Sequence, residues 1–255
     1  MFDVSLIDFN TILPFILAGF AAQVIDGALG MAFGVISSTL LVSLLGVSPA
    51  LASASVHAVE TFTTAASGAS HIYNRNVDWK LFRRLVIPGM IGGALGAYVL
   101  SSIDASVAKP FVMAYLAAIG LYLLYRAWHG PTEPRKPRVV APIGLIGGFL
   151  DAAGGGGWGP VVTSNLLVQG AAPRTAIGTV NTSEFFLTAT ISATFIATMG
   201  FAAFTVATLG ILIGGLIAAP FGAVLAKRIP ARALMVMVGM LLTTTSVYTI
   251  WKALN

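Results

Sequence analysis

The chain has 255 residues, of which 57% are hydrophobic and only 9% are charged, whereas about 25% of the residues in an ordinary soluble domain are charged. This composition excludes a soluble globular protein and a disordered chain. The absence of cysteine excludes disulfide scaffolds, thiolate zinc sites and cysteine nucleophiles. The net charge of +5 comes without a basic stripe interleaved with aromatic residues, so no nucleic-acid partner is expected. The sequence predicts an all-α polytopic membrane protein.

In chain order, residues 1–10 carry no Lys or Arg, and we expect them to form a retained lead-in and not a secretory signal. A glycine-interrupted pair of apolar arms follows, and then three apolar runs, each long enough to cross roughly 30 Å of hydrocarbon. After a polar linker the same series recurs. The arms are 11–25 with 31–45 and 139–150 with 158–168, and the crossings are 49–72, 81–100, 107–128, 173–199, 203–226 and 231–254. Because the arms are short, we expect re-entrant half-helices within the protein.

The two halves of the chain resemble each other, which indicates a duplication. Asp26 aligns with Asp151 at an offset of 125, and Glu60 aligns with Glu184 at an offset of 124. The predicted organisation is therefore a first membrane repeat at 11–128, a cytoplasmic linker at 129–138 and a second repeat at 139–255. Each repeat has three crossings plus one glycine-broken helix pair, and an odd number of crossings inverts the second repeat relative to the first.

The basic residues give an independent expectation for orientation, because Lys and Arg concentrate on the cytoplasmic side of membrane proteins. With the loop that follows residue 74 placed inside, 12 of the 14 Lys and Arg residues lie inside, and only Lys109 and Lys252 lie outside. Both termini are then extracytoplasmic. We expect a multi-pass protein of the bacterial inner membrane with the lipid bilayer as its surroundings.

Four of the nine acidic residues lie in apolar surroundings, as two repeat-related pairs. An ionised carboxylate at the centre of a bilayer costs about 2.5–3.5 kcal/mol on insertion scales, so a function is the default interpretation. Glu60 lies one turn from His57, which is a plausible proton partner. The alternative is that the acids are hydrogen-bonded and only hold helices together. The residues assigned to proton coupling are Asp26, His57, Glu60, Asp151 and Glu184.

The glycine breaks have a separate use, because a helix that restarts inside a protein presents unpaired amides that bind anions. The alternative is that the glycines only permit close helix packing. The segment is not a nucleotide-binding loop, because no Gly-Lys-Ser/Thr follows. The residues assigned to substrate binding are Gly30, Gly34, Ser37, Ser38, Gly154, Gly155, Gly156, Gly157, Thr163, Ser164, Asn165 and Asn181.

Four segments together resemble the sulfite exporter TauE/SafE family of bacterial integral membrane proteins. They are 26–34 (DGALGMAFG), 48–60 (SPALASASVHAVE), 154–160 (GGGGWGP) and 178–184 (GTVNTSE). The resemblance runs from about residue 12 to residue 254. It implies transport of sulfite, organosulfonates or related small oxyanions, with the glycine-rich breaks near the substrate path. The first break carries fewer glycines than many members of the family show.

The leading hypothesis is a secondary transporter of a small sulfur-containing anion, with a midplane site between the two repeats. Because no ATP-binding motif is present, a gradient is expected to drive the transport. A proton-coupled cation carrier that uses the buried carboxylates is the alternative. A membrane enzyme or scaffold is a more distant reading, because the chain has neither a His-Glu-X-X-His motif nor a Gly-X-Ser-X-Gly elbow. No cofactor and no metal site are expected.

The predicted topology can be tested by cysteine labelling, because the chain has no native cysteine. A cysteine introduced near Glu133 should react with a membrane-impermeant maleimide only from the cytoplasmic side, and one near Asn255 only from the outside. Reaction of both positions from the same side would contradict the inverted repeat.

Overall fold

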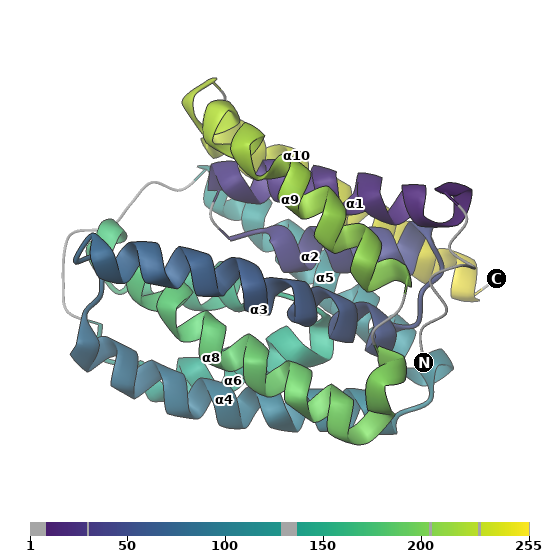
Figure 1. The fold of residues 1–255 in the computed structure, drawn as a ribbon, viewed down its shortest axis with the longest axis horizontal. Helices are drawn as coiled ribbons and strands as arrows, with labels where there is room; N and C mark the ends of the chain where they lie inside the picture. Colours follow the sequence, from purple (N-terminus) through teal and green to yellow (C-terminus); the bar gives the residue numbers. More distant parts are fainter. Residues whose placement is uncertain (1–8, 30, 129–136, 204–205, 229–230, 255) are drawn as a thin grey trace.

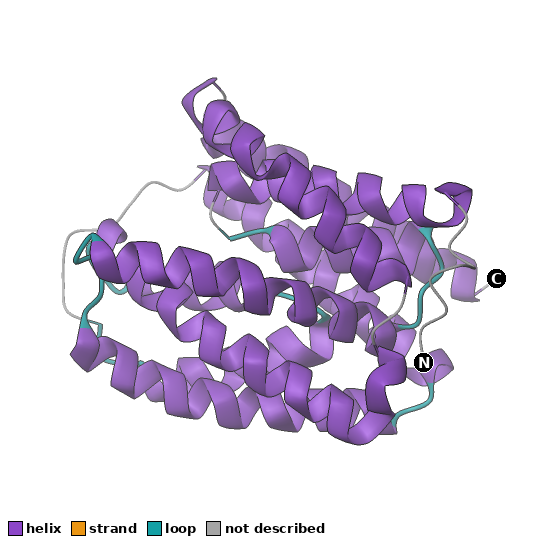
Figure 2. Ribbon diagram, viewed as in Figure 1, coloured by secondary structure: helices purple, strands orange, loops and turns teal. Residues whose placement is uncertain are grey.

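The computed structural model describes residues 9–29, 31–128, 137–203, 206–228 and 231–254. Throughout these residues the regular structure is helical and no strand occurs, as Figures 1 and 2 show. The expectation of an all-α protein is confirmed. Most of the predicted linker at 129–138 lies outside the described residues.

The described residues form six helical elements in the first half of the chain and seven in the second. The first six are α1 (Phe9–Leu29), α2 (Phe33–Thr39), the π-helical turn η2 (Leu40–Leu44), α3 (Pro49–Tyr73), α4 (Trp79–Ser102) and α5 (Ala105–Trp128). The other seven are α6 (Ala141–Gly154), the π-helical turn η3 (Gly159–Thr163), α7 (Ser164–Val168), α8 (Pro173–Met199), the 3₁₀ turn η4 (Gly200–Ala203), α9 (Val206–Arg228) and α10 (Ala231–Leu254).

The six predicted crossings correspond to α3, α4, α5, α8, α9 and α10, which have 23 to 27 residues each. Within the described residues, three helical segments are both long and apolar enough to cross a membrane by length and composition. They are Phe9–Asp26, Trp79–Ser102 and Ala105–Trp128. These apolar helices are those of a polytopic membrane protein.

The first glycine-broken region differs from its prediction. The arm expected at 11–25 is part of α1, a helix of 21 residues that passes through Asp26 and ends at Leu29. At 1.5 Å per residue it is about 30 Å long, which is a full crossing length. Its helix continues because one interior glycine costs only about 1 kcal/mol relative to alanine. The other arms are short, as predicted: α6 has 14 residues, and 33–44 and 159–168 follow the two breaks.

The helices pair across the two halves of the chain. Helix α1 packs along α9, α4 along α6, α5 along α10, and α3 along α8. This set of pairs is unchanged when every helix is exchanged for its counterpart in the other half. One difference breaks the equivalence: α8 also packs extensively along α4, whereas the counterpart contact between α3 and α9 is much smaller.

Glycines allow these helices to approach closely, as small residues do in membrane proteins. A Cβ added at Gly92 would overlap the carbonyl oxygen of Leu145, and one at Gly148 would overlap that of Gly89, so α4 and α6 touch through their backbones. In the same way, a Cβ at Gly214 of α9 would overlap the carbonyl oxygen of Ile16 in α1.

The basic helix ends lie together at one end of the bundle. In Figure 1 the end of α3, the start of α4, the end of α5 and the start of α8 lie at the left, as do the end of α9 and the start of α10. The described ends of the chain, at the start of α1 and the end of α10, lie at the right. Two contacts join the basic end: an Arg84 Nη2 atom donates to the Arg138 carbonyl at 2.9 Å, and the Arg232 guanidinium lies 5.3 Å from the Trp128 ring centroid.

Two neighbouring glycines of α9 test this packing. We expect Gly214→Ala to lower the free energy of unfolding by about 1–3 kcal/mol, because its methyl group would overlap the α1 backbone. Gly215→Ala is the matched control, since its Cβ would meet only Phe33 and Gln23 at 3.8 and 3.9 Å, and alanine stabilises a helix by up to about 1 kcal/mol. Melting temperatures of the purified variants in detergent measure the difference, and equal melting temperatures would contradict it.

Candidate functional site

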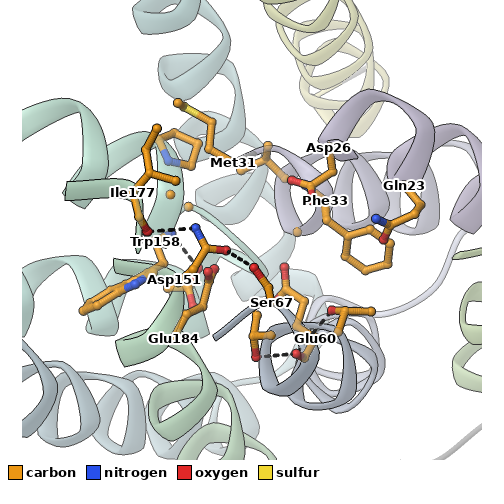
Figure 3. A pocket seen from close by; sticks show the side chains of 18 of the residues that line it. Gln23, Asp26, Met31, Phe33, Glu60, Ser67, Asp151, Trp158, Ile177 and Glu184 are labelled. Carbon is orange, nitrogen blue, oxygen red and sulfur yellow. Dashed lines mark hydrogen bonds between the residues drawn. The ribbon is translucent and has the colours of Figure 1, made fainter. Parts of the chain in front are cut away.

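A cavity of about 280 Å³ lies in the middle of the bundle, where the two helix breaks face each other. Four carboxylates line it, one from each of four helices: Asp26 from α1, Glu60 from α3, Asp151 from α6 and Glu184 from α8 (Figure 3). The two repeat-related pairs of acids therefore meet in one place. The cavity extends towards the end of α3 and the start of α8. The other polar residues that line it are Gln23, Thr63, Thr64, Ser67, His71 and Asn181.

The two aspartates cap the helices that restart after the breaks. Asp26 Oδ1 accepts hydrogen bonds from the Ala32 amide at 2.6 Å and the Phe33 amide at 3.0 Å. In the second half, Asp151 Oδ1 accepts one from the Trp158 amide at 2.7 Å. The bonds from Phe33 and from Trp158 each span seven residues, so the two repeats use the same kind of contact. The first amides of a helix have no partner within it, and a carboxylate there is favoured by both hydrogen bonding and the helix dipole.

Glu60 lies close to the restart in the first half, because a Cβ added at Gly34 would lie 3.0 Å from Glu60 Oε1. The sequence analysis expected unpaired amides at the restarted helices to bind an anion. In this structure the amides of residues 32, 33 and 158 are bonded to aspartates of the protein.

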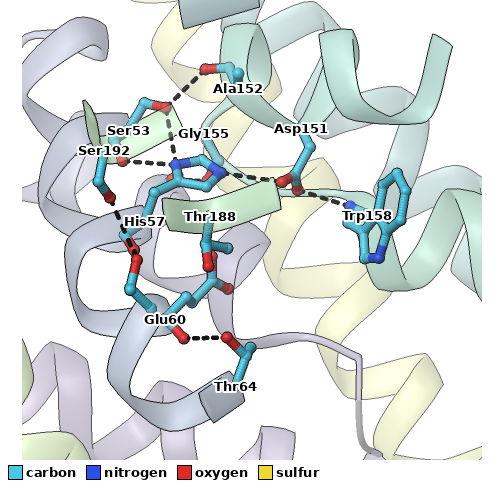
Figure 4. Close-up of polar contacts among 12 residues, drawn as sticks. Ser53, His57, Glu60, Thr64, Asp151, Ala152, Gly155, Trp158, Thr188 and Ser192 are labelled. Carbon is cyan, nitrogen blue, oxygen red and sulfur yellow. Dashed lines mark hydrogen bonds and ion pairs between the residues drawn. The ribbon is translucent and has the colours of Figure 1, made fainter. Parts of the chain in front are cut away.

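His57 joins the two halves of the chain. Its Nδ1 lies 2.7 Å from the Ser53 carbonyl oxygen, and its Nε2 lies 3.0 Å from Asp151 Oδ2 (Figure 4). A carbonyl oxygen only accepts hydrogen bonds, so Nδ1 carries a proton. One further proton then lies between Nε2 and Oδ2, and it makes the contact either an ion pair or a neutral hydrogen bond. Because His57 is fully buried, this proton is shielded from water.

The counterpart of His57 in the second half is Asn181, which behaves differently. Its Nδ2 atom donates to the Ile177 carbonyl at 3.0 Å, which repeats the bond from His57 to the residue four positions earlier. Its Oδ1 atom accepts from Ser67 Oγ at 3.2 Å. The described hydrogen bonds of Asn181 therefore go to α8 and α3 and not to Asp26. Only one of the two aspartates has a histidine partner.

The cavity is acidic throughout. Glu60 is 6% exposed and Glu184 is half-buried, and within the described residues the Glu184 carboxylate accepts no hydrogen bond. No Lys or Arg is found among the described residues that line the cavity. Several ionised carboxylates around so small a space, in low-dielectric surroundings, repel one another strongly. This arrangement favours proton uptake by some of the acids or binding of a positive charge among them.

Comparison with known proteins identifies the class. The sequence profile of the sulfite exporter TauE/SafE family matches residues 15–249. This chain belongs to that family. The Bacillus subtilis (strain 168) protein named "Probable membrane transporter protein YtnM" is 43% identical to it over 237 residues, which cover 89% of this chain and 79% of the Bacillus protein. The TauE/SafE protein described here is a membrane transporter and not an enzyme, and the central cavity is its candidate transport site.

The glycine run of this TauE/SafE protein packs against other parts of the chain. A Cβ at Gly154 or Gly157 would overlap the Tyr115 ring or its hydroxyl, and one at Gly156 would overlap the Gly34 backbone. Gly155 has a φ of 75°, in the left-handed region, and its carbonyl accepts a hydrogen bond from Ser38 Oγ. Each of these glycines is therefore required by backbone conformation or close approach. Of the four, only Gly157 lines the cavity.

The structure brings together some of the residues assigned to substrate binding and leaves others apart. Gly34, Gly157 and Asn181 line the cavity beside the four acids. Gly30 lies outside the described residues, and Ser164 begins α7. The residues that do not line the cavity are Ser37, Ser38, Gly154, Gly155, Gly156, Thr163 and Asn165. Among these, Ser37 is fully buried and its hydroxyl has no partner within the described residues.

Sequence reasoning missed Ser67 and His71. A signal for both is present in α3, because positions 57, 60, 64, 67 and 71 alternate in steps of three and four and so share one helical face. This stripe of polar residues was used in the sequence analysis only at His57 and Glu60. Gln23 has a shorter signal, because Asp26 follows it by three residues on the same face of α1.

The face of α8 that corresponds to the cavity face of α3 is packed and does not line the cavity. There, the α8 residues Leu187, Ile191 and Phe195 are at most 1% exposed. Leu187 and Ile191 pack where a Cβ at Gly93 of α4 would lie. At an offset of 124, these three apolar residues are the counterparts of Thr63, Ser67 and His71, which line the cavity. Ser53 Oγ also donates to the Ala152 carbonyl at 2.6 Å, which joins α3 to α6.

Asp151 allows a test of its structural part. Asp151→Asn can still accept from the Trp158 amide and donate to a neutral His57, so we expect a small loss of stability. Asp151→Leu removes both bonds and leaves two buried polar groups unpaired, at about 1–3 kcal/mol each. The melting temperature in detergent should therefore fall clearly further for the leucine variant. Equal melting temperatures for the two variants would show that the bonds contribute little.

Proposed function

We propose that this transporter carries a small sulfur-containing oxyanion, sulfite or an organosulfonate, together with protons through the central cavity. The observation that carries the proposal is the meeting of four acids, each buried or half-buried, from both halves in one cavity. Membership of the sulfite exporter family supports the substrate class. Asp26, Glu60, Asp151 and Glu184 are the proposed proton carriers, with His57 as the partner of Asp151.

Protonation explains how an acidic cavity can admit an anion. An ionised carboxylate repels an anion, but a protonated carboxyl group has an O–H that donates to a sulfonyl or sulfite oxygen. Gln23 and the second hydrogen on Asn181 Nδ2 supply further donors on the cavity wall. Binding of the anion and binding of the protons then favour each other by the same factor. A proton gradient can thereby drive the anion.

The proposed mechanism uses two inverted repeats with the glycine breaks as re-entrant segments at the midplane. The pairing of helices across the halves supports this. We assign the basic end of the bundle to the cytoplasm, so that both termini are extracytoplasmic in a bacterial inner membrane. The cavity extends towards the basic end, and the matched face of α8 is packed, which supports assigning this arrangement to a state that faces the cytoplasm. If the two repeats exchanged their conformations, the cavity would open on the extracytoplasmic side.

A proton-coupled cation carrier is the second candidate. It is favoured by one specific observation, the absence of Lys and Arg among the described residues that line the acidic cavity. Within the part of the chain that the structure describes, however, no three His, Asp or Glu side chains are placed to hold a metal ion together. A cation would therefore need a rearrangement of the carboxylates.

Flux into proteoliposomes separates the two functions. We expect uptake of sulfite or methanesulfonate that is accelerated by a pH gradient, and no uptake of divalent cations. Glu60→Gln and Glu184→Gln keep the shape and the hydrogen bonding of the acids but cannot release a proton. Both variants should retain anion binding, while their proton-driven accumulation of the anion should fall at least tenfold. We expect the larger effect from Glu60→Gln, because His57 lies one turn away.

Asp104→Asn is the control for this experiment, since Asp104 is an exposed acid at the start of α5. Its pKa is lowered by hydrogen bonds from Ser106, and it lies far in sequence from the cavity acids. The control should transport as the wild type does. Unchanged proton dependence in both glutamine variants would assign the carboxylates to structure, and transport of cations instead of anions would favour the second candidate.

A further inference from the structure

His71 lies at the end of the cavity that faces the basic end of the bundle. It occupies the last turn of α3, is half-buried and lines the cavity, together with Ser67 one turn earlier on the same helical face. Because no Lys or Arg lines the cavity within the described residues, and His57 is fully buried away from it, His71 is the lining side chain that can carry a positive charge. An anion that enters from this end meets His71 before the four acids.

The ring of His71 is held in a defined state by Asn76. The Nδ2 atom of Asn76 lies 3.3 Å from His71 Nδ1. An amide nitrogen only donates, so Nδ1 accepts the bond, and the proton of the neutral ring is on Nε2. The backbone bonds from the Arg75 and Asn76 amides to Ile72 and His71 close the turn after α3. Neutral His71 therefore keeps an Nε2–H donor that Asn76 does not use.

The same turn is fixed against α8. A Cβ at Gly178 would overlap the carbonyl oxygen of Asn76, so the turn after α3 touches the first part of α8 through its backbone. The Asp78 amide also donates to Thr179 Oγ1 at 2.9 Å. His71 thus sits beside a rigid contact between α3 and α8, and its position does not depend on a loose loop.

Comparison of the two halves shows that this feature is not part of the shared framework. At an offset of 124 the counterpart of His71 is Phe195, which is 1% exposed and does not line the cavity. A group able to bind an anion therefore lines the cavity at one of the two matched positions, and a buried apolar group occupies the other.

We propose that His71 is a specificity-determining residue that binds the anion at the mouth of the cavity. The neutral ring binds it through Nε2–H. When the bound anion draws a proton onto Nδ1, the Asn76 amide turns so that its Oδ1 accepts from Nδ1–H, and the charge of the ring adds to the binding. The inference rests on the proposed function, because it requires an anionic substrate. The charged and titratable groups around His71 are the cavity acids Asp26, Glu60, Asp151 and Glu184 on one side, and Arg75 and Asp78 of the adjoining turn on the other. In this acidic setting His71 makes the local potential less negative where the anion enters.

Titration calorimetry on the purified full-length protein, with sodium sulfite and with sodium methanesulfonate as probes, tests the assignment. His71→Phe introduces the residue type of the counterpart position, Phe195, and should weaken binding of both anions at least tenfold. His71→Gln keeps a donor without a charge and should weaken binding about threefold. His71→Lys keeps a charge and should bind within threefold of the wild type. Tyr73→Phe is the control, because Tyr73 is 88% exposed and does not line the cavity.

The outcomes separate the two proposals. Wild-type affinity in both His71→Phe and His71→Gln would overturn the role of His71 and leave the anion function in place. Failure of the wild type to bind either anion, with binding of manganese(II) instead, would overturn the proposed function and this inference together. Size-exclusion profiles and melting temperatures check that each variant is folded, and if His71→Phe does not fold, the threefold loss expected for His71→Gln decides.

Discussion

The hydrogen bond from the amides of each restarted helix to an aspartate is the interaction on which the rest of the site depends. A helix that begins inside a membrane protein has amides that water cannot reach, and each unpaired amide costs free energy. Asp26 and Asp151 satisfy these amides from the preceding helix. The bond fixes the angle at which the chain turns back, and it places a carboxylate at the centre of the bundle. The other two acids then approach from α3 and α8.

These hydrogen bonds decide which of the four acids have a structural explanation. A carboxylate at the start of a helix needs no catalytic or transport role to be stable there, because the helix dipole favours it. Asp26 and Asp151 are therefore framework residues first, whatever protons they exchange. Glu184 is the opposite case, since its carboxylate accepts no hydrogen bond from the described residues. For Glu184, a structural explanation is lacking.

Much of the framework could be predicted from the sequence, because it repeats. The six long helices predicted as crossings, the two breaks and the meeting of the two acid pairs follow from apolar run lengths and from matched positions in the halves. The length of α1 and the partners of the glycines could not be predicted in this way. Tyr115 meets Gly154 and Gly157 across about forty residues of chain, and no local pattern announces such a contact. The histidine at the mouth was within reach, because it continues a visible stripe on α3.

The contact between the two breaks has a consequence for how such a protein can change. Gly34 and Gly156 meet main chain to main chain, since a Cβ on Gly34 would lie 2.9 Å from the Cα of Gly156. No side chain stands between them, so the separation of the halves at this point is set by the radii of backbone atoms. Mutation cannot change that separation in small steps, because a single methyl group would already force the breaks apart. The aspartates that cap the restarted helices would move with them. Adaptation to a larger or smaller solute must come from the walls, at positions such as Met31 and Ile177, while the crossing point stays invariant.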